Sequence, residues 1–374
     1  MGTTTATTST AGATTTVTSA DSGWNGVRVV ALGGGTGLPV VLRGLKAELF
    51  RGGGPVDRSR LTAVVTVTDD GGSSGRLRRE LDMLPPGDIR NCLVALSHER
   101  PLVARLFQAR YRAGETLEGH SCGNLVLAAL AQEEGGSFLD AIEVASAVLN
   151  VRGRVLPLTL EPCRLVARLA DGAELAGESA IAGRGGRIER LRVDPPDIPP
   201  TPGVVEAIES ADIVVLGPGS LFSSLVPNVL VPEVVGALGR TRAFRVLVLN
   251  AMTEQGETGG LTAAGHARAV IEHAGFPVLD AVLVANDAIP AEVIERYRAE
   301  GAGRIEPDDP ELETLVPMVI RASVLQAGPK VRHDALLTAR TILRAHRVWR
   351  RRGRIAEPER LRPRRRAVVR GPRR

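Results

Sequence analysis

The segment from Leu61 to Leu96 restricts the fold of this chain more than any other part of the sequence. It opens with Leu61 to Val67, an apolar run rich in β-branched residues, which predicts a strand buried on both faces. Two adjacent carboxylates, Asp69 and Asp70, follow, and then a turn of glycines and serines whose N–H groups can converge on an anion. The segment therefore predicts a strand of a parallel sheet that ends in a polar turn.

A second turn in this segment adds a third carboxylate. Pro85, Pro86 and Gly87 predict a turn in which Asp88 caps the following helix. Three carboxylates at one crevice, with Arg76 and Arg90 close by in sequence, are typical of a cation-bridged phosphate site. Asp-Asp-Gly-Gly is also an ordinary turn sequence, so these residues alone leave the choice open.

The same pattern of an apolar strand followed by a polar turn recurs along the chain. Since parallel strands carry their carboxyl ends at one edge of a sheet, the turns should form one crevice for a phosphorylated ligand. We expect an α/β fold, Rossmann-like and doubly wound, with a mostly parallel sheet. The other strands predicted are Val27 to Leu32, ending in the Gly33 to Gly37 turn, Ile213 to Leu216, ending in Gly217 to Ser220, Val246 to Leu249, ending in Asn250, and Asp280 to Val284.

Three segments depart from this pattern. Residues 155–193 alternate apolar and polar side chains around an Asp171-Gly172 turn, which predicts a small antiparallel β insertion. Residues 1–26 form a Thr-rich leader that we expect to be disordered, and residues 349–374 an Arg-rich tail. The prediction is one α/β domain over residues 27–348.

Charge and cysteine content narrow the functional class. The chain has a net charge of +5, but Arg350 to Arg374 contains 12 arginines and two glutamates, so the rest has a net charge of −5. We expect no nucleic-acid binding by the folded body. The three cysteines are widely spaced, which favours neither a disulfide framework nor a zinc site, and no segment predicts a transmembrane helix. These features predict a cytoplasmic protein.

Six motifs in order resemble the family of bacterial gluconeogenesis factors, which is related in fold to 2-phospho-L-lactate transferase. The resemblance covers about residues 27–346. The motifs are VVALGGGTGL, VTVTDDGGSSGRLR, LPPGDIRNCLVAL, LEGHSCGNL, DIVVLGPGSLFSSLVPNVLV and VLNAMTEQGET.

The resemblance implies a cytoplasmic regulator that binds a nucleotide-diphosphate sugar, with UDP-N-acetylglucosamine as the expected ligand. Such a regulator serves cell shape, morphogenesis and envelope precursor supply during gluconeogenic growth. The alternative is a 2-phospho-L-lactate transferase-like enzyme that uses a guanosine diphosphate donor and a divalent cation. Mg²⁺ is the cation expected for such an enzyme. Proteins of envelope synthesis and further copies of the chain are the expected partners, and no catalytic residue is assigned.

The site residues expected from these patterns fall into two groups. The cation, if present, would be held by Asp69, Asp70 and Asp88. The two glycine turns would hold the diphosphate, and Asn228, Asn250 and Thr253 the nucleoside or sugar. The full set of expected ligand-binding residues is Gly33, Gly34, Gly35, Thr36, Gly37, Gly71, Ser73, Ser74, Arg76, Asn124, Gly217, Pro218, Gly219, Ser220, Asn228, Asn250, Thr253 and Glu254.

Overall fold

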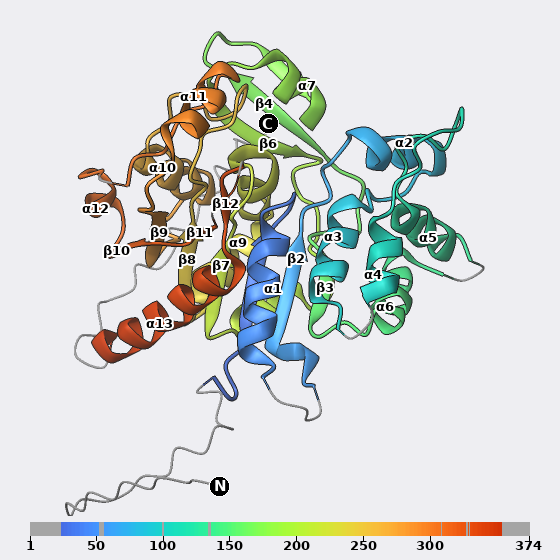
Figure 1. Cartoon of the computed structure of the whole chain (residues 1–374), viewed down its shortest axis with the longest axis horizontal. Helices are drawn as coiled ribbons and strands as arrows, with labels where there is room; N and C mark the ends of the chain where they lie inside the picture. Colours follow the sequence, from blue (N-terminus) through green and yellow to red (C-terminus); the bar gives the residue numbers. More distant parts are fainter. Residues whose placement is uncertain are drawn as a thin grey trace, which may run out of the picture.

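Seven parallel strands form the central sheet in a computed structural model of the chain (Figure 1). Their order across the sheet is β10-β9-β8-β7-β1-β2-β3, and the strands β1, β2, β7, β8 and β9 are buried along their whole length. This confirms the predicted α/β fold. The strands are β1 Val29–Gly33, β2 Leu61–Val65, β3 Arg154–Pro157, β7 Ile213–Leu216, β8 Phe244–Val248, β9 Ala281–Ala285 and β10 Met318–Ala322.

The structure describes residues 24–51, 56–98, 101–133, 136–307, 309–326, 328 and 330–353. The predicted leader up to residue 23 and the predicted tail from residue 354 lie outside the described residues.

The strand order reverses at β1. The chain moves from β1 to β2 and β3 on one side, and then returns to β7, β8, β9 and β10 on the other. Both β2 and β7 pair with β1 in parallel, with Val29 opposite Leu61 and opposite Ile213. Ligands of open α/β sheets bind beyond the carboxyl ends of the strands at such a reversal, because the connections diverge there and leave a crevice. The turns after β1 and β7 are therefore at the position where a ligand is expected.

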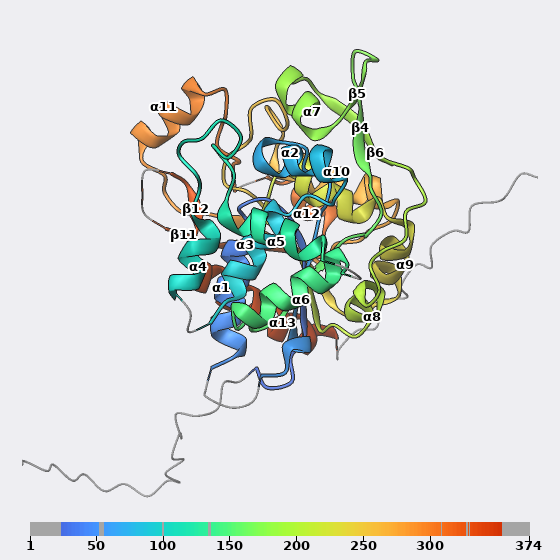
Figure 2. The ribbon, with the colours of Figure 1, turned by 90° about the vertical axis from the view of Figure 1, so that its right-hand side faces the viewer.

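Helices cover both faces of the sheet, as Figures 1 and 2 show. Alternate residues of each strand point to opposite faces, so Ala31 packs in one core and Leu32 in the other. The first face carries α1 Leu38–Leu49, α3 Gly87–Leu96, α6 Phe138–Val148 and α13 Ala335–Gly353. The second carries α8 Val204–Glu209, α9 Pro232–Arg240 and α10 Ala263–Ala274. The remaining helices are α2 Gly72–Leu81, α4 Pro101–Gln108, α5 Cys122–Ala131, α7 Glu178–Arg184, α11 Ala291–Ala299 and α12 Leu312–Leu315.

The first and last helices of the described chain, α1 and α13, lie against each other (Figure 1). Their backbones approach closely at Gly44. A Cβ at this position would lie 1.8 Å from the carbonyl oxygen of Ala335 and 2.9 Å from Cβ of Ala339. Only glycine permits this approach, which fixes the start of α13 beside the first turns of α1.

The β insertion is present but begins later than predicted. Its three antiparallel strands, β4 Arg164–Leu169, β5 Glu174–Ala176 and β6 Ile188–Asp194, have the order β5-β4-β6. The turn at Gly172 joins β4 and β5, as expected. The predicted start at Val155 is wrong, because Arg154–Pro157 pairs with β2 as the edge strand of the main sheet. After β5 the chain forms α7 before it returns to the sheet as β6, so this part is not a continuous strand.

Two further features bear on the site. The segment predicted as a glycine and serine turn after Asp70 is largely helix α2. A two-stranded ribbon, β11 Leu325–Gln326 and β12 Arg332–His333, precedes α13.

No described helix is by itself long and apolar enough to cross a membrane. The helices Leu221–Val229 and Pro232–Arg240 meet such a test only as a pair bent by 71°.

Candidate functional site

The two glycine-rich turns that flank the reversal of strand order touch each other. The first joins β1 to α1, and the second follows β7 with a cis peptide between Gly217 and Pro218. A Cβ on Gly37 would lie 2.4 Å from the carbonyl oxygen of Pro218 and 3.1 Å from the nitrogen of Gly219. The first turn ends at the N-terminus of α1, where free N–H groups and the helix dipole favour an anion.

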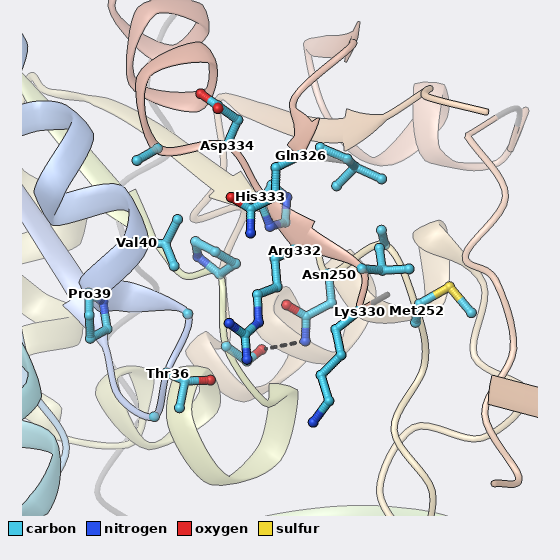
Figure 3. Close-up of a pocket in the computed structure, with 18 of the residues that line it drawn as sticks. Thr36, Pro39, Val40, Asn250, Met252, Gln326, Lys330, Arg332, His333 and Asp334 are labelled. Carbon is cyan, nitrogen blue, oxygen red and sulfur yellow. Dashed lines mark hydrogen bonds between the residues drawn. The ribbon is translucent and has the colours of Figure 1, made fainter. Parts of the chain in front are cut away.

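A cavity of about 800 Å³ opens over these turns (Figure 3). This volume lies within the range of pockets that hold a nucleotide-sized ligand. The predicted residues that line the cavity are Gly35, Thr36, Gly37, Pro218, Gly219, Ser220, Asn250, Thr253 and Glu254. The sheet edge therefore unites the two glycine turns with the turn after β8, as the sequence predicted.

Three cationic side chains also line the cavity: Arg43 of α1, Lys330, and Arg332 of β12. Lys330 and Arg332 extend into it from the segment before α13, on the side of Thr36 and Asn250 (Figure 3). Within the described part of the chain, none of the three forms a hydrogen bond or ion pair through its side chain. Burial lowers the pKa of Arg43, and the neighbouring charge of Arg332 lowers it further. Cations that lack protein partners fit an anionic ligand.

Two carboxylates in the cavity wall are occupied by protein groups. Asn250 donates from Nδ2 to Oε1 of Glu254 at 3.0 Å and to the carbonyl oxygen of Gly219 at 3.1 Å. Asp334 accepts the N–H of Leu337 at 2.8 Å, in the first turn of α13. These bonds orient both acids, which keep their negative charges, so the lining carries three positive and two negative side chains.

Asp88 lies beneath the first glycine turn, but it is not the helix cap that the sequence predicted. Helix α3 starts at Gly87, with Pro86 as its cap, and Oδ2 of Asp88 accepts the N–H of Gly35 at 2.6 Å. The carboxylate binds the neighbouring turn because this places it in a gap left by Gly34, whose Cβ would lie 2.8 Å from Oδ2. Burial raises the pKa of Asp88 to about 6, and the charge of Asp69 adds to the increase.

The other two predicted cation ligands differ in orientation. Asp69 accepts the N–H of Gly71 through Oδ1 at 2.9 Å. Asp70 turns toward α7, where Oδ1 accepts the N–H and hydroxyl of Ser179 at 2.8 and 2.6 Å. Among the described residues, no three Asp, Glu, His or Cys side chains are grouped so as to hold a metal ion. The cation therefore stays a prediction, and the charge of Asp69 acts on Asp88, since it contributes to the raised pKa of that carboxyl.

A further acid completes this corner. Burial raises the pKa of Glu178 in α7 to about 8, and the charges of Asp69, Asp88 and Asp70 contribute. Glu178 did not follow from the sequence pattern, because it comes after β5 of the antiparallel insertion and not after a strand of the parallel sheet. An acidic corner of this kind is favourable for a cation and unfavourable for a bare phosphate, so the phosphate-binding part of the site is the glycine turns.

Several predicted ligand-binding residues instead form a buried polar network beside the cavity. Oγ of Ser73 lies 2.9 Å from Nδ1 of His120 and accepts a bond from Asn124 at 2.9 Å. Arg90 donates to the side chains of Ser121 and Asn124. The network joins α2, α3 and the start of α5, and its members do not line the cavity.

The remaining predicted residues also bind protein groups. Ser74 accepts the N–H of Gly87 at 3.2 Å, and Arg76 donates to the carbonyl oxygens of Thr116 and Glu118. Asn228 is fully buried and donates to the carbonyl oxygens of Ser224 and Leu225. The remaining predicted glycines do not line the cavity either; they are Gly33, Gly34, Gly71 and Gly217.

Four further side chains that line the cavity were not predicted from the sequence. They are Arg43, Tyr297, Lys330 and Arg332. Tyr297 and His333 are the aromatic side chains among the described lining residues, and the hydroxyl of Tyr297 accepts the N–H of Val331 at 3.2 Å. None of the four follows a strand of the parallel sheet, so the pattern that revealed the turns did not include them.

The chain is similar to known proteins over most of its length. Residues 29–325 match the family model described as 2-phospho-L-lactate transferase CofD. The gluconeogenesis factor of Bacillus subtilis (strain 168) is 44% identical over 308 residues, which cover 82% of this chain and 94% of that protein. A protein of Thermotoga maritima described as a gluconeogenesis factor is 43% identical over 325 residues, covering 86% and 100%.

A solved structure gives the same result for the fold. The crystal structure of a UPF0052 family member from Bacillus halodurans is 43% identical and superposes with a TM-score of 0.79, covering 85% of this chain and 99% of that one. The motif resemblance to gluconeogenesis factors is thereby confirmed, and the chain belongs to the 2-phospho-L-lactate transferase CofD family.

Proposed function

We propose that the protein is a cytoplasmic regulator that binds a UDP-sugar, with UDP-N-acetylglucosamine as the expected ligand, and that it acts in morphogenesis and envelope precursor supply during gluconeogenic growth. The observation that carries this proposal is the cavity in which two contacting glycine turns meet three cations whose side chains have no partner among the described residues. The gluconeogenesis factors to which the chain is similar support the regulatory role.

The proposed binding mode follows from the chemistry of the lining. N–H groups at the start of α1 and in the turn of Gly219 and Ser220 would bind the diphosphate, with Arg332 and Lys330 balancing its charge. Tyr297 offers a planar ring for the base. The side chain of Asn250 donates both to Glu254 and to the carbonyl oxygen of Gly219, and these two bonds hold it beside the second glycine turn. The side chains of Tyr297 and Asn250 are already held by protein contacts, which lowers the entropy lost on binding.

Calorimetric titration tests the proposal. UDP-N-acetylglucosamine, UDP-glucose, GDP and GTP are titrated into the purified protein, each with and without magnesium. We expect the uridine sugars to bind in both conditions. A protein that binds none of them under either condition contradicts the proposal.

The acidic corner favours a second function, that of a 2-phospho-L-lactate transferase-like enzyme with a guanosine diphosphate donor. Asp69 and Asp88 are oxygen donors of the kind that a divalent cation prefers, and a cation between them would offset the repulsion that, after burial, contributes to the raised pKa of Asp88. Such a cation would neutralise charge on the leaving phosphate. The family model lends this alternative its support.

The two functions separate in one experiment. Magnesium-dependent binding of guanosine diphosphates, with turnover that is lost in Asp88→Asn, supports the transferase. Binding of UDP-sugars that persists in the presence of a chelator supports the regulator. The expected partners, further copies of the chain and proteins of envelope synthesis, are tested by light scattering and by co-purification in both ligand states.

A further inference from the structure

Two acidic residues of the loop after β8, Glu254 and Glu257, lie side by side between two cavities. Glu254 lines the cavity over the glycine turns, and Glu257 lines a second cavity of about 920 Å³ between α10 and the β insertion. The two carboxyl groups form a hydrogen bond with each other. An ionised carboxylate only accepts hydrogen bonds, so one member of the pair must hold a proton to make this contact.

The pair belongs to a closed ring of hydrogen bonds around the second glycine turn. Oε1 of Glu257 accepts the N–H of Ser223 at 2.7 Å and that of the preceding residue at 3.1 Å. Oε1 of Glu254 accepts from Nδ2 of Asn250 at 3.0 Å, and the same nitrogen donates to the carbonyl oxygen of Gly219 at 3.1 Å. The backbone between Gly219 and Ser223 completes the ring. The bond between the two carboxyl groups therefore ties the turn to Asn250.

Glu257 is the member of the pair that holds the proton. Burial, the hydrogen bond to Glu254 and the charge of Glu254 raise the pKa of Glu257 to about 9, and the charge of Glu178 in α7 contributes. The charges that act on Glu257 are thus those of acids, which favour its protonated form. The other charged or titratable side chains that line the second cavity are Arg187, Glu189, Arg268, Glu272, His273 and Glu311.

The surroundings of Glu254 are different. The charged or titratable side chains that line the first cavity with it are Arg43, Tyr297, Lys330, Arg332, His333 and Asp334. On the side of α10 the charge of Glu254 acts on the buried His266, where it opposes the burial that lowers the pKa of this histidine. Cations around Glu254 and acids around Glu257 both place the shared proton on Glu257.

We propose that Glu257 is a positioning residue for the ligand cavity and acts through one proton that it shares with Glu254. This inference rests on the proposed function, since the ligand is the UDP-sugar proposed above. Loss of the proton would break the ring and set a second negative charge beside the diphosphate, so the protonated pair should bind the ligand more tightly. Because Glu257 lines the second cavity, its proton can exchange while a ligand occupies the first.

Glu257→Gln tests the inference, because an amide offers the same acceptor and donor but has no proton to lose in this range. UDP-N-acetylglucosamine is titrated calorimetrically into both proteins from about pH 7 to about pH 10. At about pH 7 the two affinities should agree within about twofold. From about pH 8 to about pH 10 the wild type should lose affinity by up to about tenfold relative to the variant, as expected for one proton with this pKa. Other groups that titrate in this range are common to both proteins and cancel in the ratio.

Two further variants and one spectrum make the test specific. Glu257→Leu removes both contacts and should weaken binding about tenfold or more at about pH 7. Glu233→Gln removes an exposed carboxylate of α9 outside both cavities and should follow the wild type at every pH. The infrared difference spectrum of the wild type and Glu257→Gln at about pH 7 should contain the carbonyl band of a protonated carboxyl group, whether or not a ligand is present.

Each result bears on the two proposals differently. An affinity ratio between wild type and Glu257→Gln that is constant over the whole pH range overturns the inference and leaves the proposed function in place. Glu257→Gln that binds much more weakly at about pH 7, or a spectrum without the carboxyl band, also overturns the inference alone. If the wild type shows the band but binds no UDP-sugar at any pH, the proposed function fails and the positioning role fails with it.

Discussion

Gly37→Ala tests whether the two glycine turns form one rigid unit. The backbone at Gly37 has φ −77° and ψ −50°, which alanine adopts without strain, so the effect comes from the new methyl group. Its carbon would lie 2.4 Å from the carbonyl oxygen of Pro218, and the turns must separate by about 1 Å to reach ordinary van der Waals contact. Such overpacking costs about 1–3 kcal/mol of unfolding free energy.

The displacement should also weaken binding of UDP-N-acetylglucosamine by about tenfold or more, because the N–H groups of the two turns would no longer converge on one diphosphate. Urea denaturation followed by circular dichroism measures the stability, and calorimetry measures the affinity. The loss of a good N-cap is an alternative cause, since alanine caps helices poorly. Gly37→Ser separates the two causes, because serine is a good cap but carries the same Cβ.

A control variant removes the remaining ambiguity. Gly183→Ala adds a methyl group within α7, where nothing lies within 4 Å, and should leave stability unchanged or raise it by up to about 1 kcal/mol. If Gly37→Ser is as stable as the wild type and binds the ligand equally well, the contact between the turns is not what limits this position, and the reasoning is refuted.

Three other variants have defined expectations. Arg332→Gln, at an exposed position, should lower UDP-sugar affinity about tenfold at low salt with little change in stability; a variant with wild-type affinity contradicts the role of this cation. Asp280→Asn leaves the buried guanidinium of Arg245 without its paired carboxylate and should cost about 3 kcal/mol in urea denaturation, whereas Asp194→Asn, in an exposed pair, should cost less than about 1 kcal/mol. Burial lowers the pKa of His333 to about 4 from 6.5, so the folded state binds fewer protons than the unfolded state between these values. Stability should therefore fall by up to about 3 kcal/mol as the pH drops from 6.5 to 4, and parallel pH profiles of the wild type and His333→Gln would show that this residue is not the cause.

The sequence predicted the inner part of the fold well. Five strands of the central sheet and the antiparallel insertion follow from apolar runs that end in polar or glycine turns. A short apolar run that is buried on both faces forms an inner strand of a sheet. Ile213–Leu216 is an example, and its bounds match the prediction. The edge strands β3 and β10 were missed, because an edge strand is paired on one side only and β10 is merely half-buried along its length.

The candidate site was predicted in part for the same reason. Strand-end turns meet at one edge of a parallel sheet, so the positions of Gly37, Gly219 and Asn250 follow from topology alone. Side-chain direction does not follow from it. Asn228 follows the second glycine turn, and Asn124 was expected at the same site, but both side chains bind other protein groups. Arg332 reaches the cavity from a short two-stranded ribbon that the strand pattern of the sequence did not predict.

The close packing of α13 on α1 at Gly44 has a consequence for the time at which the protein becomes functional. The cavity takes Gly35 and Arg43 from the start of the described chain and Lys330 and Arg332 from near its end. During synthesis the central sheet can assemble strand by strand. The cavity acquires Lys330 and Arg332 only when α13 has left the ribosome and docked. On the proposed binding mode, we expect that a nascent chain without α13 does not bind the UDP-sugar and that binding stabilises completed molecules over truncated ones.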